Sequence, residues 1–347
     1  MSKSNPGNFL EDFAPGQAIA HATPRTITEG DVALNIALTG SRYALFSADS
    51  FAQDCGLPSA PIDPLLVFHI VFGKSVPDIS LNAVANLGYA EGRFLAPVYA
   101  GDTLNAVSEV LGVKQNSNGK TGVVTVRTEG FNQDGAPVLS YVRWVMVNKR
   151  DANADVKDAP AKTPAQAVTA SELLLPPGLD FTNYDFALAG SPHAFEHYEV
   201  GEKIDHVDGV TIEEAEHQLA TRLYQNTAKV HFDALVQKNS RFGKRLIYGG
   251  VAISLARALA FNGLANAAYM LAINGGRHVN PLFAGDTLYA WSEVLAKEDL
   301  GPAGALRLRL VAMKNRACAD FPLKTEAGEY DPAVVLDFDY WAAIPKR

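Results

Sequence analysis

The sequence is poor in several features that mark common protein classes. Cysteine occurs only twice, as Cys55 and Cys318, and no CxxC motif is present. A disulfide framework or a cysteine-built zinc site is therefore not expected. The longest apolar run, "PLLVFHIVFG" from Pro64, is too short to span a bilayer. The first residues contain no apolar core of signal-peptide length. We therefore expect a cytoplasmic protein without a membrane partner.

An excess of basic residues is also missing. The chain has 30 Lys and Arg against 38 Asp and Glu, which gives a formal net charge of −8. Nucleic acid is not expected as a partner, because phosphate binding needs a basic face. No GxGxxG motif follows a strand, and no histidines and carboxylates have the spacing of metal ligands. Neither a cofactor nor a metal is expected.

What the chain does contain is an internal repeat. "AGDTLNAVSEVL" begins at Ala100 and "AGDTLYAWSEVL" begins at Ala284, an offset of 184 residues. Arg93 and Arg277 keep the same offset, and the endings "LSYVRWVMVNKR" and "LDFDYWAAIPKR" are alike. A period of this length indicates two copies of one domain rather than a solenoid.

The repeat and the composition between its copies define the expected domains. Residues 151–175 are rich in Ala, Pro, Asp and Lys, which is typical of a linker. We expect an N-terminal domain over residues 1–150 and a C-terminal domain over residues 176–347. The oligomeric state stays open, with a homo-oligomer as one option.

Each half has the same expected layout. A polar stretch with helical preference is followed by a loop, an apolar helix and several strands. In the second half the helix is "GGVAISLARALAFNG", residues 249–263, whose apolar residues recur all round, as in a buried helix. Alternating patterns predict strands in "DTLYAWSEVL", "ALRLRLVAMKN" and "AVVLDFDYW". One buried helix followed by an antiparallel meander predicts an α+β fold with a curved sheet around the helix.

The two copies differ in the loop before the buried helix. The second copy reads "YQNTAKVHFDALVQK" from Tyr224, and His231 aligns with Phe46 or Ser47 of the first copy. Neither of these side chains can act as a base. In contrast, Asp102 and Asp286 occur in both copies, next to glycine, and fit a shared turn. Because His231 occurs in one copy only, function is expected there, and the first domain is expected to be catalytically silent.

This arrangement resembles the double-hotdog proteins of the MaoC-like enoyl-CoA hydratase group. Within that group the chain is most similar to the mesaconyl-CoA hydratase family, through "LYQNTAKVHFDA", "GSRYALFSADSFAQDCGLPSAPIDPLLVFHIVFGKSVPDISLNAVANLGYAEG" and "VVLDFDYWAAIPKR". The resemblance implies a tandem hotdog fold. It also implies reversible hydration of mesaconyl-CoA to β-methylmalyl-CoA, in carbon metabolism such as the ethylmalonyl-CoA pathway, with a CoA thioester as the small-molecule partner.

The resemblance also implies roles for particular residues. His231 matches the catalytic histidine, and Asn226 stands where the family motif has an aspartate. Histidine can take and give a proton near neutral pH, whereas an amide can only hold a water molecule. Gly250 is expected to present its backbone N–H to the thioester oxygen, and Gly249 to permit close approach. An additional acid could come from nearby carboxylates, namely Glu213, Glu214, Glu216 or Asp233.

Positive side chains are expected to bind the anionic parts of the substrate. Lys229 replaces a proline of the family motif and is a candidate for the free carboxylate of mesaconyl-CoA. Alternative cations for that carboxylate are Arg277, Arg222 and Arg42. Lys244 and Arg245 are candidates for contacts with the CoA phosphates.

Three other functions fit the resemblance less well. One is an (R)-specific hydratase of other acyl chains, and another is a hotdog thioesterase. Thioesterases commonly carry a carboxylate on the buried helix, and residues 249–263 contain none. The third is a non-catalytic acyl-CoA-binding module, which gives no reason for His231.

Overall fold

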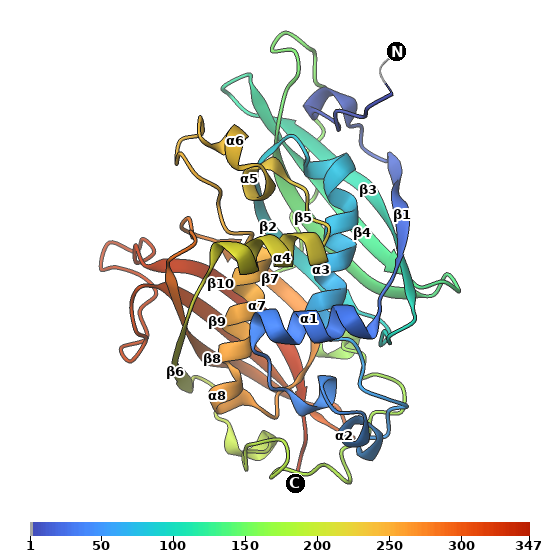
Figure 1. Ribbon diagram of the computed structural model, residues 1–347, viewed down its shortest axis with the longest axis vertical. Helices are drawn as coiled ribbons and strands as arrows, with labels where there is room; N and C mark the ends of the chain where they lie inside the picture. Colours follow the sequence, from blue (N-terminus) through green and yellow to red (C-terminus); the bar gives the residue numbers. More distant parts are fainter. Residues whose placement is uncertain (1–2) are drawn as a thin grey trace.

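The computed structural model describes residues 3–347, and its strands form one continuous sheet. Ten strands follow the order β1-β3-β4-β5-β2-β7-β10-β9-β8-β6, and every neighbouring pair is antiparallel. The first five strands along the chain make one half and the last five make the other. The predicted α+β class, with a curved antiparallel sheet around a buried helix in each half, is confirmed (Figure 1).

The first half contains five strands, three α-helices and three short turns of helix. They are β1 (Ala18–Thr26), α1 (Glu29–Thr39), α2 (Asp49–Asp54), α3 (Pro64–Ser75), β2 (Ala83–Phe94), β3 (Thr103–Gln115), β4 (Thr121–Phe131) and β5 (Pro137–Asn148). The short turns are η1 (Leu10–Asp12), η2 (Ala44–Phe46) and η3 (Val76–Ser80), the last of which is π-helical. Between β5 and β6 the chain crosses the molecule with only η4 (Ala170–Glu172) and η5 (Phe195–His197).

The second half repeats this order with a more divided loop. Its elements are β6 (Lys203–Thr211), α4 (Glu214–Leu223), α5 (Lys229–Phe232), α6 (Ala234–Gln237), α7 (Gly249–Leu259), α8 (Phe261–Leu264), β7 (Tyr269–His278), β8 (Thr287–Asp299), β9 (Gly304–Lys314) and β10 (Val334–Ile344). The three strands predicted here are confirmed within a few residues. The helix predicted over 249–263 ends earlier, at Leu259, because Asn262 and Gly263 leave the helical backbone.

The two halves meet at β2 and β7. Tyr89 lies opposite Gly276 and Gly92 lies opposite Ile273. Both 276 minus 92 and 273 minus 89 equal 184, so the pairing follows the repeat offset and relates the halves by a pseudo-twofold. A side chain at Gly92 would collide with Ile273, so glycine is needed for this close approach.

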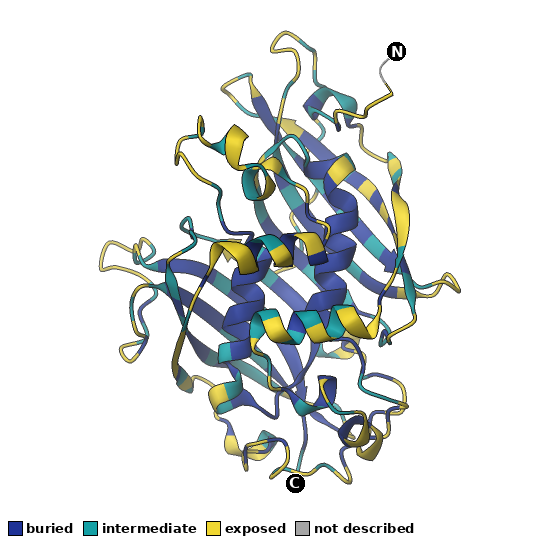
Figure 2. Ribbon diagram, in the orientation of Figure 1, coloured by how far each residue is buried: buried dark blue, intermediate teal, exposed yellow. Residues whose placement is uncertain are grey.

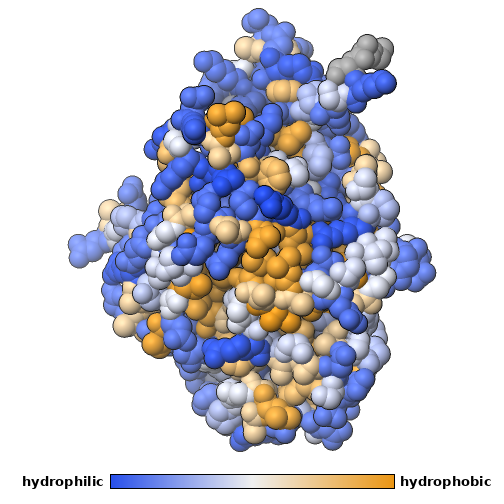
Figure 3. All heavy atoms as spheres, viewed as in Figure 1, coloured by the Kyte–Doolittle hydropathy of each residue, from blue (hydrophilic) through white to orange (hydrophobic). Residues whose placement is uncertain are grey.

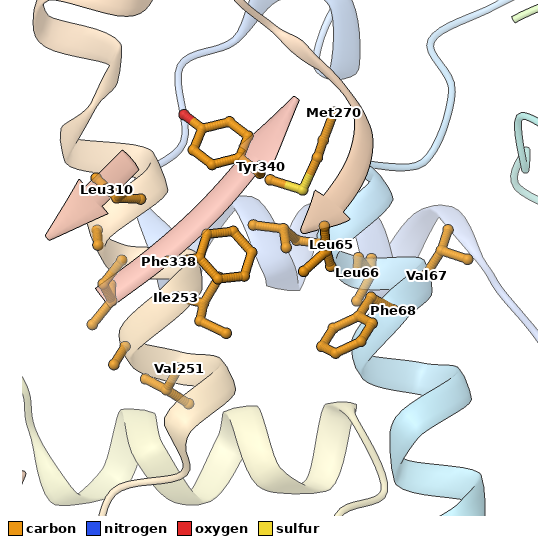
Figure 4. Close-up of a cluster of buried hydrophobic side chains, with 14 of the residues drawn as sticks. Leu65, Leu66, Val67, Phe68, Val251, Ile253, Met270, Leu310, Phe338 and Tyr340 are labelled. Atoms are coloured by element: carbon orange, nitrogen blue, oxygen red, sulfur yellow. The ribbon is translucent and has the colours of Figure 1, made fainter. Parts of the chain in front are cut away.

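Helices α3 and α7 lie side by side against the concave face of the sheet, and α1 and α4 cross over them (Figure 1). The central pair is buried almost throughout, whereas α1 and α4 expose their outer faces (Figure 2). The core packs Leu66 and Phe68 of α3 and Ile253 of α7 against Phe338 of β10 (Figure 4). Hydrophobic residues also gather on the surface between α1 and α4 (Figure 3).

The repeated "AGDTL" stretches form the same turn twice. Asp102 accepts a hydrogen bond from the Tyr99 N–H at 2.8 Å, and Asp286 accepts one from the Phe283 N–H at 2.9 Å. The glycine before each aspartate has a positive φ, which glycine adopts without strain. The prediction that these aspartates serve the fold is confirmed.

Candidate active site

A cavity of about 520 Å³ lies between the two halves. The first half lines it with residues of α3, η3, β2 and β5, and the second half with the loop around α5 and α6, the start of α7 and the end of β7. In Figure 1, α5 and α6 lie beside β2, although more than a hundred residues separate them in sequence. The cavity is therefore built from both copies of the repeat.

His231 lines this cavity from α5. Its Nδ1 lies 2.9 Å from the Leu246 carbonyl oxygen, which can only accept, so Nδ1 donates and Nε2 keeps a free lone pair. Burial lowers the pKa of His231 to about 4, because a low-dielectric wall disfavours the imidazolium. The side chain is thus a neutral imidazole at physiological pH, with an acceptor available to a water molecule.

Asn226 lies at the same wall and is buried. Its side-chain oxygen accepts a hydrogen bond from the Ala228 N–H at 3.2 Å, which fixes the amide. No hydrogen bond among residues 3–347 uses the amide nitrogen. Asn226 can therefore donate to a water molecule near His231 without losing its own support.

Helix α7 begins at this cavity without a side-chain cap. Gly249 lines the cavity, and Gly250 is buried beneath the rings of Tyr248 and His69. The backbone N–H groups of Gly249 and Gly250 have no acceptor within the described chain. The free N–H of Gly249 and the positive end of the helix dipole thus meet at the cavity, where they can stabilise a developing oxyanion, and the free N–H of Gly250 follows directly in the helix.

His278, at the end of β7, is a second histidine in the cavity that the sequence analysis did not single out. Its Nε2 lies 3.2 Å from the Tyr89 hydroxyl, and its ring packs directly on Gly249, where a Cβ would collide with it. Burial and the neighbouring His231 lower the pKa of His278 to about 4. The repeat offset pairs His278 with Phe94, so the single-copy criterion that selected His231 would also have found it.

No acidic side chain lines the cavity within the described residues. Of the four carboxylates considered as helpers, Asp233 caps α6 and Glu214 pairs with Arg245. Glu213, just before α4, and Glu216, within it, are exposed and do not line the cavity either. A carboxylate partner for His231 is therefore not found among residues 3–347.

The predicted substrate-binding cations lie at or beyond the rim. Lys229 lines the cavity with an exposed side chain. Lys244 lies 4.1 Å from the centre of the Phe283 ring, and that ring packs on Phe242 of the cavity lining. Arg245 is held by Glu214. Three other arginines were considered for the carboxylate and do not line the cavity, namely Arg42, Arg222 and Arg277.

Two further properties bear on the class of protein. In residues 3–347 no helix is both long and apolar enough to cross a membrane. Within the same residues, no group of three or more His, Cys, Asp or Glu side chains is arranged to hold a metal ion.

Solved structures place this architecture among the double-hotdog, MaoC-like proteins. A Mycobacterium tuberculosis protein with a double hotdog fold has a TM-score of 0.78 and 26% identity, covering 97% of this chain and 98% of its own. A crystal structure from Chloroflexus aurantiacus, described as a MaoC domain protein dehydratase, has a TM-score of 0.97 and 61% identity over 100% of both chains.

The family model described as mesaconyl-CoA hydratase matches residues 2–321. A β-methylmalyl-CoA dehydratase of Chloroflexus aurantiacus is 61% identical over 100% of this chain and 99% of its own length. The chain belongs to the mesaconyl-CoA hydratase family.

Proposed function

We propose that this protein is a hydro-lyase that interconverts mesaconyl-CoA and β-methylmalyl-CoA. The observation that carries this proposal is the cavity itself, where a neutral His231 and the uncapped start of α7 face one space. Membership of the family supports the substrate. The product of hydration carries the hydroxyl group on the carbon that bears the free carboxylate.

The chemistry uses these groups in order. A water molecule donates to Nε2 of His231 and accepts from the amide of Asn226. Its oxygen forms a bond to the β-carbon while the π electrons move toward the thioester carbonyl, and His231 takes the water proton. The N–H groups of Gly249 and Gly250 stabilise the resulting oxyanion. His231 then returns a proton to the α-carbon and becomes neutral again, so water has added across the double bond.

The direct test follows the enoyl-thioester absorbance after mixing purified protein with mesaconyl-CoA, with product identification by mass spectrometry. The absorbance should fall and β-methylmalyl-CoA should form. Starting from β-methylmalyl-CoA, the same equilibrium mixture should appear. The exposed His193 provides a control, since His193→Ala should leave turnover unchanged. Absence of conversion in both directions would refute the proposed activity.

A further inference from the structure

Arg143 is a fully buried cation in the cavity wall. It lies in the middle of β5, has 0% exposure and lines the cavity. One guanidinium nitrogen donates to the Ser75 hydroxyl at 2.8 Å and another to the Ser80 hydroxyl at 3.4 Å. The group also stacks on the Phe72 ring, with Cζ 4.2 Å from its centre. The local structure therefore fixes the orientation of the guanidinium.

The charge of Arg143 is not neutralised. No carboxylate of the described chain lies within 4 Å of it. Its Nε has no hydrogen-bond partner. A buried guanidinium that is bonded only to hydroxyl groups is costly unless an anion compensates it.

Other unpartnered polar atoms line the same cavity. Both side-chain polar atoms of Asn86 are buried without a hydrogen bond, and so is the Tyr248 hydroxyl. Both residues line the cavity with Arg143. Asn86 lies in β2, where Tyr89 is the direct register partner of Arg143. Three residues thus present donors that the protein itself leaves unused.

We infer that Arg143, with Asn86 and the Tyr248 hydroxyl beside it, binds the free carboxylate of the substrate. This inference rests on the proposed function for the identity of the acyl group. In mesaconyl-CoA the carboxylate is attached to the carbon that takes up water, so it must lie just beyond His231. Tyr248 connects the two places, since its ring is 5.4 Å from that of His231 and 5.7 Å from that of Phe72.

This assignment leaves Lys229 with a different part of the substrate. An exposed lysine at the rim is strongly hydrated and contributes little to binding a small buried anion, whereas a rigid buried guanidinium offers paired donors. Lys229 is better placed to meet the CoA moiety, which must extend out of the cavity mouth. Arg143 also has no counterpart in the other half, where Tyr340 takes its place opposite Ile273.

The test uses two substrates that differ only at this group. In (E)-2-methylbut-2-enoyl-CoA a methyl group replaces the carboxylate of mesaconyl-CoA. In Arg143→Met, kcat/KM for mesaconyl-CoA should fall about 100-fold or more, because a buried charge pair loses one partner. Activity on the methyl analogue should stay equal or rise. The ratio of the two kcat/KM values is the readout, and a mere loss of packing would lower both.

Three variants sharpen the result. Arg257→Met removes another buried arginine, which lies in α7 outside this cavity, and should leave the ratio unchanged. Lys229→Ala should lower both activities by a similar, small factor. Arg143→Lys keeps the charge and should retain part of the preference, which secures a folded protein if methionine disturbs the core. An unchanged ratio in Arg143→Met and Arg143→Lys would overturn the inference.

Binding separates this inference from the proposed function. 2-Methylsuccinyl-CoA and 2-methylbutanoyl-CoA lack the double bond and cannot be hydrated, so calorimetry can measure their affinities without turnover. The wild type should bind 2-methylsuccinyl-CoA more tightly, and Arg143→Met should lose this preference. If mesaconyl-CoA is not hydrated but this preference is present and depends on Arg143, the proposed activity fails and the carboxylate site stands. If the wild type has no such preference, the carboxylate site fails.

Discussion

The carboxylate of Asp63 caps the start of α3, whereas its counterpart α7 begins at Gly249 with no side-chain cap. Asp63 accepts a hydrogen bond from the Leu65 N–H at 2.8 Å, and Pro64 contributes no N–H at all. In the first copy, the Asp63 carboxylate thus occupies the helix start that is proposed to bind the thioester oxyanion in the second copy. The second copy leaves the equivalent donors free, and both histidines that line the cavity, His231 and His278, belong to that copy.

Histidines that occur in both copies show the opposite behaviour. His21 bonds the Ser108 hydroxyl at 2.7 Å, and His206 bonds the Ser292 hydroxyl at 2.8 Å, with the two serines 184 residues apart. Both rings hold equivalent strands together. Residues kept in both halves therefore maintain the scaffold, and residues present in one half mark the site.

The largest expected effect comes from removing His231, the proposed base. His231→Ala should lower kcat at least about 100-fold, in the range of general acid–base groups, without loss of secondary structure by circular dichroism. The variant loses the Nδ1–H bond to the Leu246 carbonyl and the ring contacts with Tyr248 and His217. Turnover near the wild-type rate would show that the proton is carried elsewhere, with His278 as the next candidate.

Exchanging the helix starts tests the comparison itself. Gly249→Pro gives α7 the first residue of α3, removes one free N–H and presses on His278. Because loss of one oxyanion donor costs roughly 100-fold in kcat, a decrease of that size is expected. The reciprocal Pro64→Gly should leave kcat unchanged. Equal effects of the two substitutions would show that the helix starts do not differ in function.

Asn226→Ala should have a smaller effect, about 10-fold on kcat, because His231 still accepts from the water molecule. Asn226→Asp introduces the aspartate of the MaoC-like hydratase motif and serves as the comparison variant. If water positioning is the role, the aspartate variant should retain more activity than the alanine variant. Identical rates for the wild type and both variants would show that Asn226 has only a structural role in the loop.

The pH dependence follows from burial of the histidines. With the pKa of His231 lowered to about 4, kcat/KM should stay level as pH falls through 6.5 and decline only toward 4. Stability behaves differently. Six histidines of the described chain have a pKa lowered by desolvation, so the unfolded chain takes up protons first, and stability present above pH 6.5 is lost as pH falls toward 4. An acid limb of kcat/KM at 6.5 in folded protein would contradict the assignment.

The smallest effect is expected at the filled site of the first half. Asp63→Asn keeps a helix-capping oxygen but removes a carboxyl whose pKa burial raises to about 6. A raised pKa means that stability present below the unfolded pKa is lost as pH rises through 6. Asp63→Asn should therefore be at least as stable as the wild type at pH 7.5, with unchanged turnover. Thermal melting measures the stability and kcat measures the turnover. A lower kcat would show that Asp63 of the first half takes part in catalysis.

The repeat, the fold class and the importance of the loop that carries His231 into the cavity could all be predicted from the sequence, because each leaves a local pattern. The turns at Asp102 and Asp286 have the same sequence, AGDTL, in both copies, whereas the first copy has no histidine at the position of His231. The end of α7 was missed, since Ala260 and Phe261 continue an apolar helical pattern and only tertiary packing decides where the helix stops. Strand boundaries shifted by a few residues for the same reason.

Arg143 left no such signal. In "LSYVRWVMVN" apolar residues occupy both faces of the strand, so alternation does not tell which way the arginine points. Arginine is also among the residues least often fully buried, so the ordinary expectation places it outside. Only the register with β2 brings it to the cavity. A long-range juxtaposition of this kind becomes visible when the strands are assembled.

The pairing of β2 with β7 has a consequence for why the two copies remain on one chain. Each half presents an edge strand at this seam, so separate copies could also pair with copies of their own kind. A pair of first copies would lack His231, and a pair of second copies would lack Arg143. Covalent linkage fixes the stoichiometry at one copy of each type, so that β2 of a first copy pairs with β7 of a second copy. For two copies that differ in this way, the covalent connection ensures that a first copy always folds against a second copy.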